Sequence, residues 1–128
     1  ESVTEQKNSL AVCLDNILRH AGITRNTEYD LAQGKTATTI LSENMTGVQV
    51  LDLSGCTLDA VLYYVNQDIP VLAILEDGEA VLVTGFNEFN VVIMEPSTGK
   101  LYKKGMNDAT TWFAENGNHF ITYMSIEN

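Results

Sequence analysis

The sequence predicts an α+β fold in which N-terminal helices pack on a C-terminal antiparallel sheet. Residues 8–67 are dominated by apolar side chains at helical spacing. Residues 70–96 then hold three short apolar runs, separated by the turn-forming sequences EDGE and NEFN. Helices followed by a meander of strands are typical of α+β domains rather than of alternating α/β domains. The chain has 128 residues, which is the size of one domain, so we expect a single domain over residues 1–128.

The first predicted helix begins at a polar cap and ends at a glycine. Asn8 or Ser9 can accept a hydrogen bond from a free amide of the first turn. Gly22 suits the left-handed conformation that often follows a helix. Thr57 is expected to cap a later helix with one strongly apolar face. This helix is expected at residues 57–67. Between it and the first helix we expect helices at 24–34 and 36–44 and an extended run at 48–53.

The meander is expected to contain strands at 71–75, 80–86 and 91–95. Asp77-Gly78 favours a tight turn between the first two strands. Gly85 lies inside a strand, which suggests a bulge or a close approach of another backbone segment. The remaining expected elements are a strand at 101–103, a short helix capped by Asn107 or Asp108, and a last strand at 120–124.

The charge of the chain excludes several classes of partner. The formal net charge is −10, with only seven Lys and Arg residues, which argues against nucleic acid and anionic membranes as partners. No run reaches the roughly 18 apolar residues of a transmembrane span, so no membrane insertion by this segment is expected. The chain begins at Glu1 and lacks a basic-then-apolar leader, and we interpret it as a mature or excised piece of a larger protein.

The cysteines and histidines predict neither a metal site nor a cofactor. Cys13 and Cys56 could form one disulfide in an exported protein, or could be two buried free thiols. His20 and His119 lie far apart in the sequence, and there is no ligand spacing such as CxxC or HExxH. We therefore expect no metal and no cofactor.

Three segments together resemble a known family. They are residues 14–22, which end a capped helix, residues 58–73, which close on DIPVLA, and residues 81–96, which run from VLVTGF to an acid before proline. In order and spacing they resemble the bacteriocin-processing cysteine peptidases, the papain-like domains of peptide-exporting transporters and their free-standing bacterial relatives. The resemblance covers nearly the whole chain. It implies a papain-like cysteine peptidase fold.

The same resemblance implies where a catalytic site would lie. The family has a Cys at the start of the first helix, and this position is Ser9 in the chain. The oxyanion Gln of the family falls on Val3, with Gln6 nearby but three residues away. The family His falls on Glu79, and the Asp or Asn before proline falls on Glu95. A cysteine peptidase needs a thiol, a base and a group that orients the base. The resemblance therefore implies a degenerate site and a catalytically inactive member.

Cys13 is the alternative nucleophile. It lies one turn after Ser9 on the same helical face, so a shift of one turn would place it at the catalytic position. Its neighbours are large and apolar, which favours a packed core thiol. His20 is two turns further along the helix, about 10 Å by rise, and cannot reach the thiol. His119 is expected to lie far from the start of the first helix.

Two functions follow as hypotheses. The first is a non-catalytic peptidase-like domain that binds a peptide or another domain of its parent protein, or has a structural role, with an acidic cleft around Glu79 and Glu95. The second is an active cysteine peptidase or thiol hydrolase that uses Cys13. The two glutamates could share a proton and support acid–base chemistry, or could be two solvated acids. Tyr63 and Tyr64 could line a peptide groove or belong to the core and surface.

We expect this domain outside the cell, on the surface of a bacterium or secreted from it. The low Lys content, the many Asn and Thr residues and the acidic charge are typical of such domains. A Cys13–Cys56 disulfide would support export.

Overall fold

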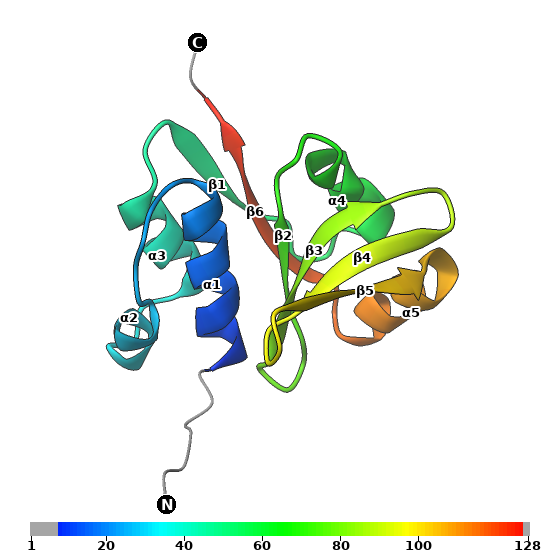
Figure 1. Cartoon of the computed structure of the whole chain (residues 1–128), viewed down its shortest axis with the longest axis horizontal. Helices are drawn as coiled ribbons and strands as arrows, with labels where there is room; N and C mark the ends of the chain where they lie inside the picture. The colour runs from blue at the N-terminus through cyan, green and yellow to red at the C-terminus, as the bar shows by residue number, and fades with distance from the viewer. Residues whose placement is uncertain (1–7, 127–128) are drawn as a thin grey trace, which may run out of the picture.

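A computed structural model of the chain describes residues 8–126, and Figure 1 labels its elements. The helices in this part are α1 (Ser9–His20), α2 (Glu28–Ala32), α3 (Ala37–Asn44), α4 (Leu58–Val65) and α5 (Met106–Glu115). The strands are β1 (Val48–Asp52), β2 (Val71–Ile74), β3 (Ala80–Phe86), β4 (Asn90–Glu95), β5 (Lys100–Gly105) and β6 (His119–Ser125). The predicted α+β class is confirmed.

The strands form one antiparallel sheet in the order β1-β6-β2-β3-β4-β5. Strands β2 to β4 are the predicted meander, and β5 extends it, so that each strand from β2 to β5 pairs with the next. The last strand, β6, returns to lie between β1 and β2. It is therefore an interior strand, and its first residues after His119 are buried on both faces of the sheet.

Helices cover both faces of the sheet (Figure 1). The first three helices lie on one face, where α1 packs on β2 and β3 and α3 packs on β1. The other two helices, α4 and α5, cover the opposite face. The N-terminal helices thus pack on the sheet as predicted, and a second helical layer completes the domain.

Alternation along the central strands explains why the apolar runs are continuous. Leu72 and Leu82 face α1, whereas Val71 and Val83 face α4 and α5, and all four side chains are at most 2% exposed. Because successive side chains of a strand point to opposite faces, a sheet covered on both faces needs apolar residues at nearly every position.

The start and end of α1 follow the predicted capping pattern. Asn8, rather than Ser9, is the cap, because its Oδ1 accepts a hydrogen bond from the Leu10 N–H at 2.8 Å. Gly22 follows the helix with a φ of +85°. Ser9 is consequently the first residue of the helix, and its hydroxyl is free of the capping role.

Two predicted helix starts are wrong. The helix expected at 24–34 begins only at Glu28, because Thr27 is buried and donates from both its N–H and its hydroxyl to Asp15 Oδ1, at 2.8 and 2.7 Å. Asn107 and Asp108 do not cap α5, which begins at Met106 directly after β5. The Met106 N–H donates to the Phe89 carbonyl at 2.8 Å, so tertiary pairing sets this boundary.

The bulge predicted at Gly85 is confirmed, since the register between β3 and β4 shifts between Val83 and Gly85.

Within residues 8–126, no helix has both the length and the apolar character that a membrane span requires.

Candidate functional site

The start of α1 contacts the start of β3, although the two are 71 residues apart in the chain. The backbone N–H of Ala80 donates to Ser9 Oγ at 2.9 Å. Ala80 is only 1% exposed, and Ser9 is half-buried. The structure therefore brings Ser9, at the start of the first helix, close to the start of the hairpin strand, where the resemblance places Glu79.

Glu79 lies next to this contact and is held by the β2–β3 turn. Its N–H donates to Asp77 Oδ1 at 2.9 Å, and its carbonyl accepts from the Leu75 N–H at 2.8 Å. The side chain is exposed. The backbone of the turn thus fixes the position of Glu79 beside the start of α1, and its carboxylate faces solvent.

Glu95 belongs to a different turn. It ends β4 before Pro96, it is half-buried, and its carboxylate accepts a hydrogen bond from Ser97 Oγ at 2.7 Å. Its polar contact is thus within its own β-turn. An exposed Glu79 and a turn-bonded Glu95 fit two separate, solvated acids better than a pair that shares a proton.

Cys13 is a core residue on the buried face of α1. Its side chain is 0% exposed and lies in the apolar cluster between α1, α3 and the sheet. Burial, with a smaller contribution from the negative charge of Glu95, raises the pKa of Cys13 to about 12. A helix start lowers the pKa of a reactive thiol, and Cys13 sits one turn too deep for that environment.

The two cysteines are free thiols on opposite sides of the sheet. Cys13 packs under α1, whereas Cys56 is half-buried against the cluster under α4 and α5. A disulfide needs Cα atoms within about 7 Å, and the intervening sheet prevents this approach. Of the two possibilities open from the sequence, the structure has the free thiols.

The two histidines differ in their distance from Ser9. His20 Nε2 contacts the Asp68 carbonyl at 3.1 Å, at the opposite end of α1. His119 pairs with Ile74, which in turn pairs with Ala80. Two strand spacings, about 10 Å, separate the His119 and Ala80 backbones. His119 therefore lies two strands away from the contact between Ser9 and Ala80, and among the described residues no hydrogen bond joins it to Ser9.

His119 has an acidic neighbour of its own. The pKa of Asp52 is lowered mainly by hydrogen bonds from the Ser54 hydroxyl and amide, and to a smaller extent by His119.

The positions expected for an oxyanion glutamine, Val3 and Gln6, lie outside the described residues. Among residues 8–126, no group of three or more His, Cys, Asp or Glu side chains is arranged to hold a metal ion.

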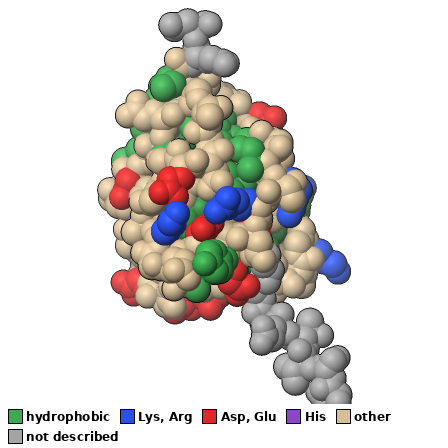
Figure 2. Space-filling view, turned by 90° about the vertical axis from the view of Figure 1, so that its left-hand side faces the viewer, with side chains coloured by type: hydrophobic (Ala, Val, Ile, Leu, Met, Phe, Trp, Pro, Cys, Tyr) green, Lys and Arg blue, Asp and Glu red, His purple; other side chains and the backbone are tan. Residues whose placement is uncertain are grey.

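Acidic side chains gather at the end of the molecule where α1 starts. Figure 2 views the side covered by α1 to α3, and red side chains line its lower edge near the N-terminal trace. Glu28 accepts from the Asn8 N–H at 3.4 Å, and the exposed Glu76, Asp77 and Glu79 belong to the adjacent hairpin. Away from this end, Lys35 forms an ion pair with Glu43 of α3 at 2.7 Å.

The Ser9 hydroxyl is expected to contribute to stability. In Ser9→Ala the buried Ala80 N–H loses its acceptor, which should lower the free energy of unfolding by about 1–3 kcal/mol. Urea denaturation measures this change. Ser42→Ala, at an exposed position of α3, is the matched control and should change the free energy by less than about 0.5 kcal/mol. Equal effects of both substitutions would contradict the role of this hydrogen bond.

Comparison with known proteins identifies the fold. No protein-family model matches the chain, and no curated protein matches it. Among solved structures, it is similar to the crystal structure of a Bacillus anthracis protein described as a C39-like peptidase, with a TM-score of 0.78. The two chains are 14% identical, and the match covers 95% of this chain and 90% of the other. The chain therefore has the papain-like fold of a C39-like peptidase. Ser9 lies at the start of α1, the helix that packs on β2 and β3.

Proposed function

We propose that this chain is a non-catalytic peptidase-like domain that binds a peptide or another domain of its parent protein. The observation that carries the proposal is the contact between Ser9 Oγ and the Ala80 N–H at 2.9 Å. At the junction of α1 and β3 the chain has a hydroxyl that accepts a backbone hydrogen bond, with Glu79 as the adjacent side chain. Neither of the two histidines of the chain is within hydrogen-bond distance of this hydroxyl.

The burial of Cys13 supports the same proposal. With a pKa of about 12, roughly one thiol in 10⁵ is ionised at pH 7. The thiolate is the nucleophile in cysteine chemistry, and the side chain has no exposed surface from which to attack a peptide. An active thiol hydrolase that uses Cys13 would need both a large opening of α1 and a base.

Binding rather than catalysis suits the acidic end of the domain. Glu28 contacts Asn8 at the positive end of α1, and Glu76, Asp77 and Glu79 belong to the hairpin whose Ala80 contacts Ser9. Carboxylates grouped at a protein surface attract cationic partners and repel anionic ones. We therefore propose that the ligand or docking domain presents Lys, Arg or a free amino group at this end.

A titration with a cationic peptide tests this binding. We expect trilysine to shift the backbone NMR signals of Ser9, Ala80 and their neighbours, and the double variant Glu76→Gln/Glu79→Gln to lose most of this response. The variant Glu88→Gln/Glu115→Gln removes the same charge from exposed positions elsewhere and is the matched control. If both variants bind trilysine alike, the attraction is a property of the net charge, and the acidic end at the start of α1 is not the binding site.

We also propose that the domain acts on the surface of a bacterium or after secretion. The support is compositional, because the chain is strongly acidic, has few Lys and has many Asn and Thr residues. The Cys13–Cys56 disulfide, which would have strengthened this proposal, is not formed. Cell fractionation of the source organism is the test, and recovery in the cytosol alone would contradict the proposal.

A further inference from the structure

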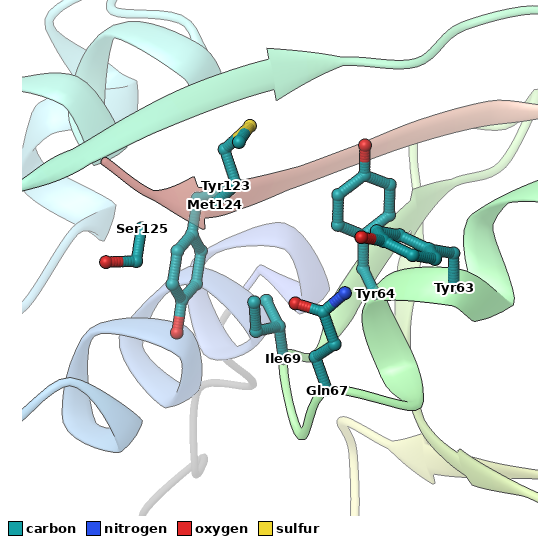
Figure 3. Close-up of a pocket in the computed structure, with 7 residues that line it drawn as sticks. All are labelled: Tyr63, Tyr64, Gln67, Ile69, Tyr123, Met124 and Ser125. Carbon is teal, nitrogen blue, oxygen red and sulfur yellow. The ribbon is translucent and has the colours of Figure 1, made fainter. Parts of the chain in front are cut away.

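A tyrosine-lined pocket lies at the end of the sheet opposite Ser9. It has a volume of about 560 Å³ and is open to solvent. It is formed by the end of α4, the loop into β2 and the end of β6, as Figure 3 shows. Its lining residues are Tyr63, Tyr64, Gln67, Ile69, Tyr123, Met124 and Ser125.

The pocket lies along an open edge of β6. The Phe120 carbonyl accepts from the Leu53 N–H, and the Ile126 N–H donates to the Gly47 carbonyl, so even-numbered residues of β6 direct their backbone groups toward β1. Because these groups alternate along an antiparallel strand, Tyr123 directs its N–H and carbonyl the other way, toward β2.

Strand β2 does not reach far enough to pair with Tyr123. It begins at Val71, and its pairing with β6 ends at Leu72 opposite Ile121. Pro70, the next residue outward, has no N–H, and its carbonyl accepts from the Thr122 hydroxyl at 2.9 Å. Within the described residues, the backbone of Tyr123 thus has no strand partner on this side.

Side chains from both faces of β6 line the pocket. Tyr123 and Met124 are consecutive residues, and Figure 3 shows them on opposite sides of the ribbon. Tyr123 belongs to the cluster under α1, whereas Met124 lies on the face of α4. A pocket can contact both only where it wraps around the edge of the strand, which places the pocket directly beside the unpaired backbone.

The aromatic wall of the pocket is exposed. Tyr63 is 63% exposed and Met124 is 40% exposed. The rings of Tyr63 and Tyr64 are 5.1 Å apart and nearly perpendicular, at 89°. Two perpendicular rings with an aliphatic floor at Ile69 form a corner that fits a bulky apolar side chain, and tyrosine rings bury a large area with little loss of conformational entropy.

The charge beside the pocket is negative. Asp68, whose φ is +66°, adjoins the pocket. Burial, with a smaller contribution from the negative charge of Asp68, raises the pKa of Tyr123. No Lys or Arg lines the pocket, in a chain whose net charge is −10. A ligand with a basic residue within two residues of its apolar residue is therefore complementary to this edge, and an acidic ligand is not.

We infer that this pocket is a second binding site, which takes an extended peptide with a bulky apolar side chain and a Lys or Arg within two residues of it. The peptide adds as a short strand to β6 at Tyr123, and its apolar side chain enters the corner formed by Tyr63 and Tyr64. Backbone pairing at a strand edge with side-chain pockets alongside is a recurring mode of peptide recognition. The site goes beyond the proposed function, because it lies about 14 Å along β6 from the His119–Ala80 row near Ser9.

A titration with the capped pentapeptide KTLTK tests this site. We expect it to shift the backbone NMR signals of Tyr123 and Ile69, and we expect Tyr63→Ala to weaken binding about 10-fold. Tyr29→Ala is the matched control, because Tyr29 on α2 is 68% exposed and outside the pocket. The peptides ETLTE and KTGTK, and KTLTK with N-methylated central amides, should each bind about 10-fold more weakly than KTLTK, since they lack the charge, the apolar side chain and the backbone donors, respectively.

The inference is overturned if KTLTK leaves the signals of the pocket unchanged, or if Tyr63→Ala and Tyr29→Ala bind it equally. Equal binding of the N-methylated peptide would overturn the strand pairing. Shifts confined to Ser9 and Ala80 would assign the peptide to the acidic end of α1, and would contradict this second site while leaving the proposed function intact. Thermal unfolding of both tyrosine variants verifies that each is folded.

Discussion

Replacing Phe120 with alanine is expected to lower the free energy of unfolding by about 3–5 kcal/mol. Phe120 is 0% exposed on β6, and its ring packs edge-on against Phe113 of α5 with centroids 5.3 Å apart. The substitution removes a large apolar side chain from the interior strand and leaves a cavity under α4 and α5. Guanidinium denaturation monitored by circular dichroism measures the loss.

Phe120→Leu is the control for this cavity. Leucine fills most of the volume and remains apolar, so its effect should be less than half that of alanine. If both variants lose the same stability, the loss comes from the aromatic contact with Phe113 and not from the cavity. A change below about 1 kcal/mol for Phe120→Ala would contradict the assignment of β6 to the interior of the sheet.

The domain is expected to become less stable at alkaline pH because of Cys13. The pKa of this thiol rises from an ordinary value of 9.0 to about 12 in the folded chain. Above pH 9 the unfolded chain releases the proton while the folded chain keeps it, so stability is complete below pH 9 and falls by about 1.4 kcal/mol per pH unit up to pH 12. By pH 10.5 the loss is about 2 kcal/mol. The raised pKa values of Tyr102 and Tyr123 act in the same direction.

Cys13→Ala separates the thiol from the tyrosines. Urea unfolding at a series of pH values from 8 to 10.5 gives the free energy of both proteins. The variant is less stable at pH 8, because it has a small cavity, but its stability should fall by about 2 kcal/mol less over this range. Parallel curves would show that the Cys13 thiol ionises in the folded chain as easily as in the unfolded one.

The parts of the fold that local chemistry decides could be predicted from the sequence. Thr36 and Thr57 cap α3 and α4 through their own side chains, and Gly85 marks the bulge. Asn8 and Ser9 were equivalent as caps in the sequence. Only the Ala80 N–H, which comes from a distant strand, gives Ser9 a different partner.

Where tertiary contacts override local preference, the sequence was insufficient. Thr27 uses its polar groups on Asp15 instead of on the first turn of a helix, and α5 starts where β5 ends rather than at Asn107 or Asp108. The position of His119 had a usable signal, because alternation puts it on the same face as Ile121. Its distance from α1 depended on the strand order, which periodicity does not determine.

Only the resemblance, and no pattern in the sequence itself, suggested where a candidate site would lie. The resemblance paired the start of α1 with the start of β3, and the hydrogen bond between Ser9 and Ala80 joins these two places. The direction of the Glu95 carboxylate was not predictable, because its contact with Ser97 depends on the geometry of one turn. A groove lined by Tyr63 and Tyr64 was one of two alternatives that the sequence left open, and both residues line the pocket. The place of the pocket beside Tyr123 could not be predicted, since it depends on β2 stopping short of that residue.

Alkylation of Cys13 is the most direct measurement of whether this papain-like domain retains thiol chemistry. In a Cys56→Ser background, which leaves Cys13 as the only thiol, iodoacetamide at pH 7.5 is followed by mass spectrometry with and without urea. A buried thiol with a pKa of about 12 should stay unmodified in the folded protein and react only as urea unfolds the chain. Rapid modification of folded protein would contradict the account, because it would mean that Cys13 is an accessible thiolate and a candidate nucleophile.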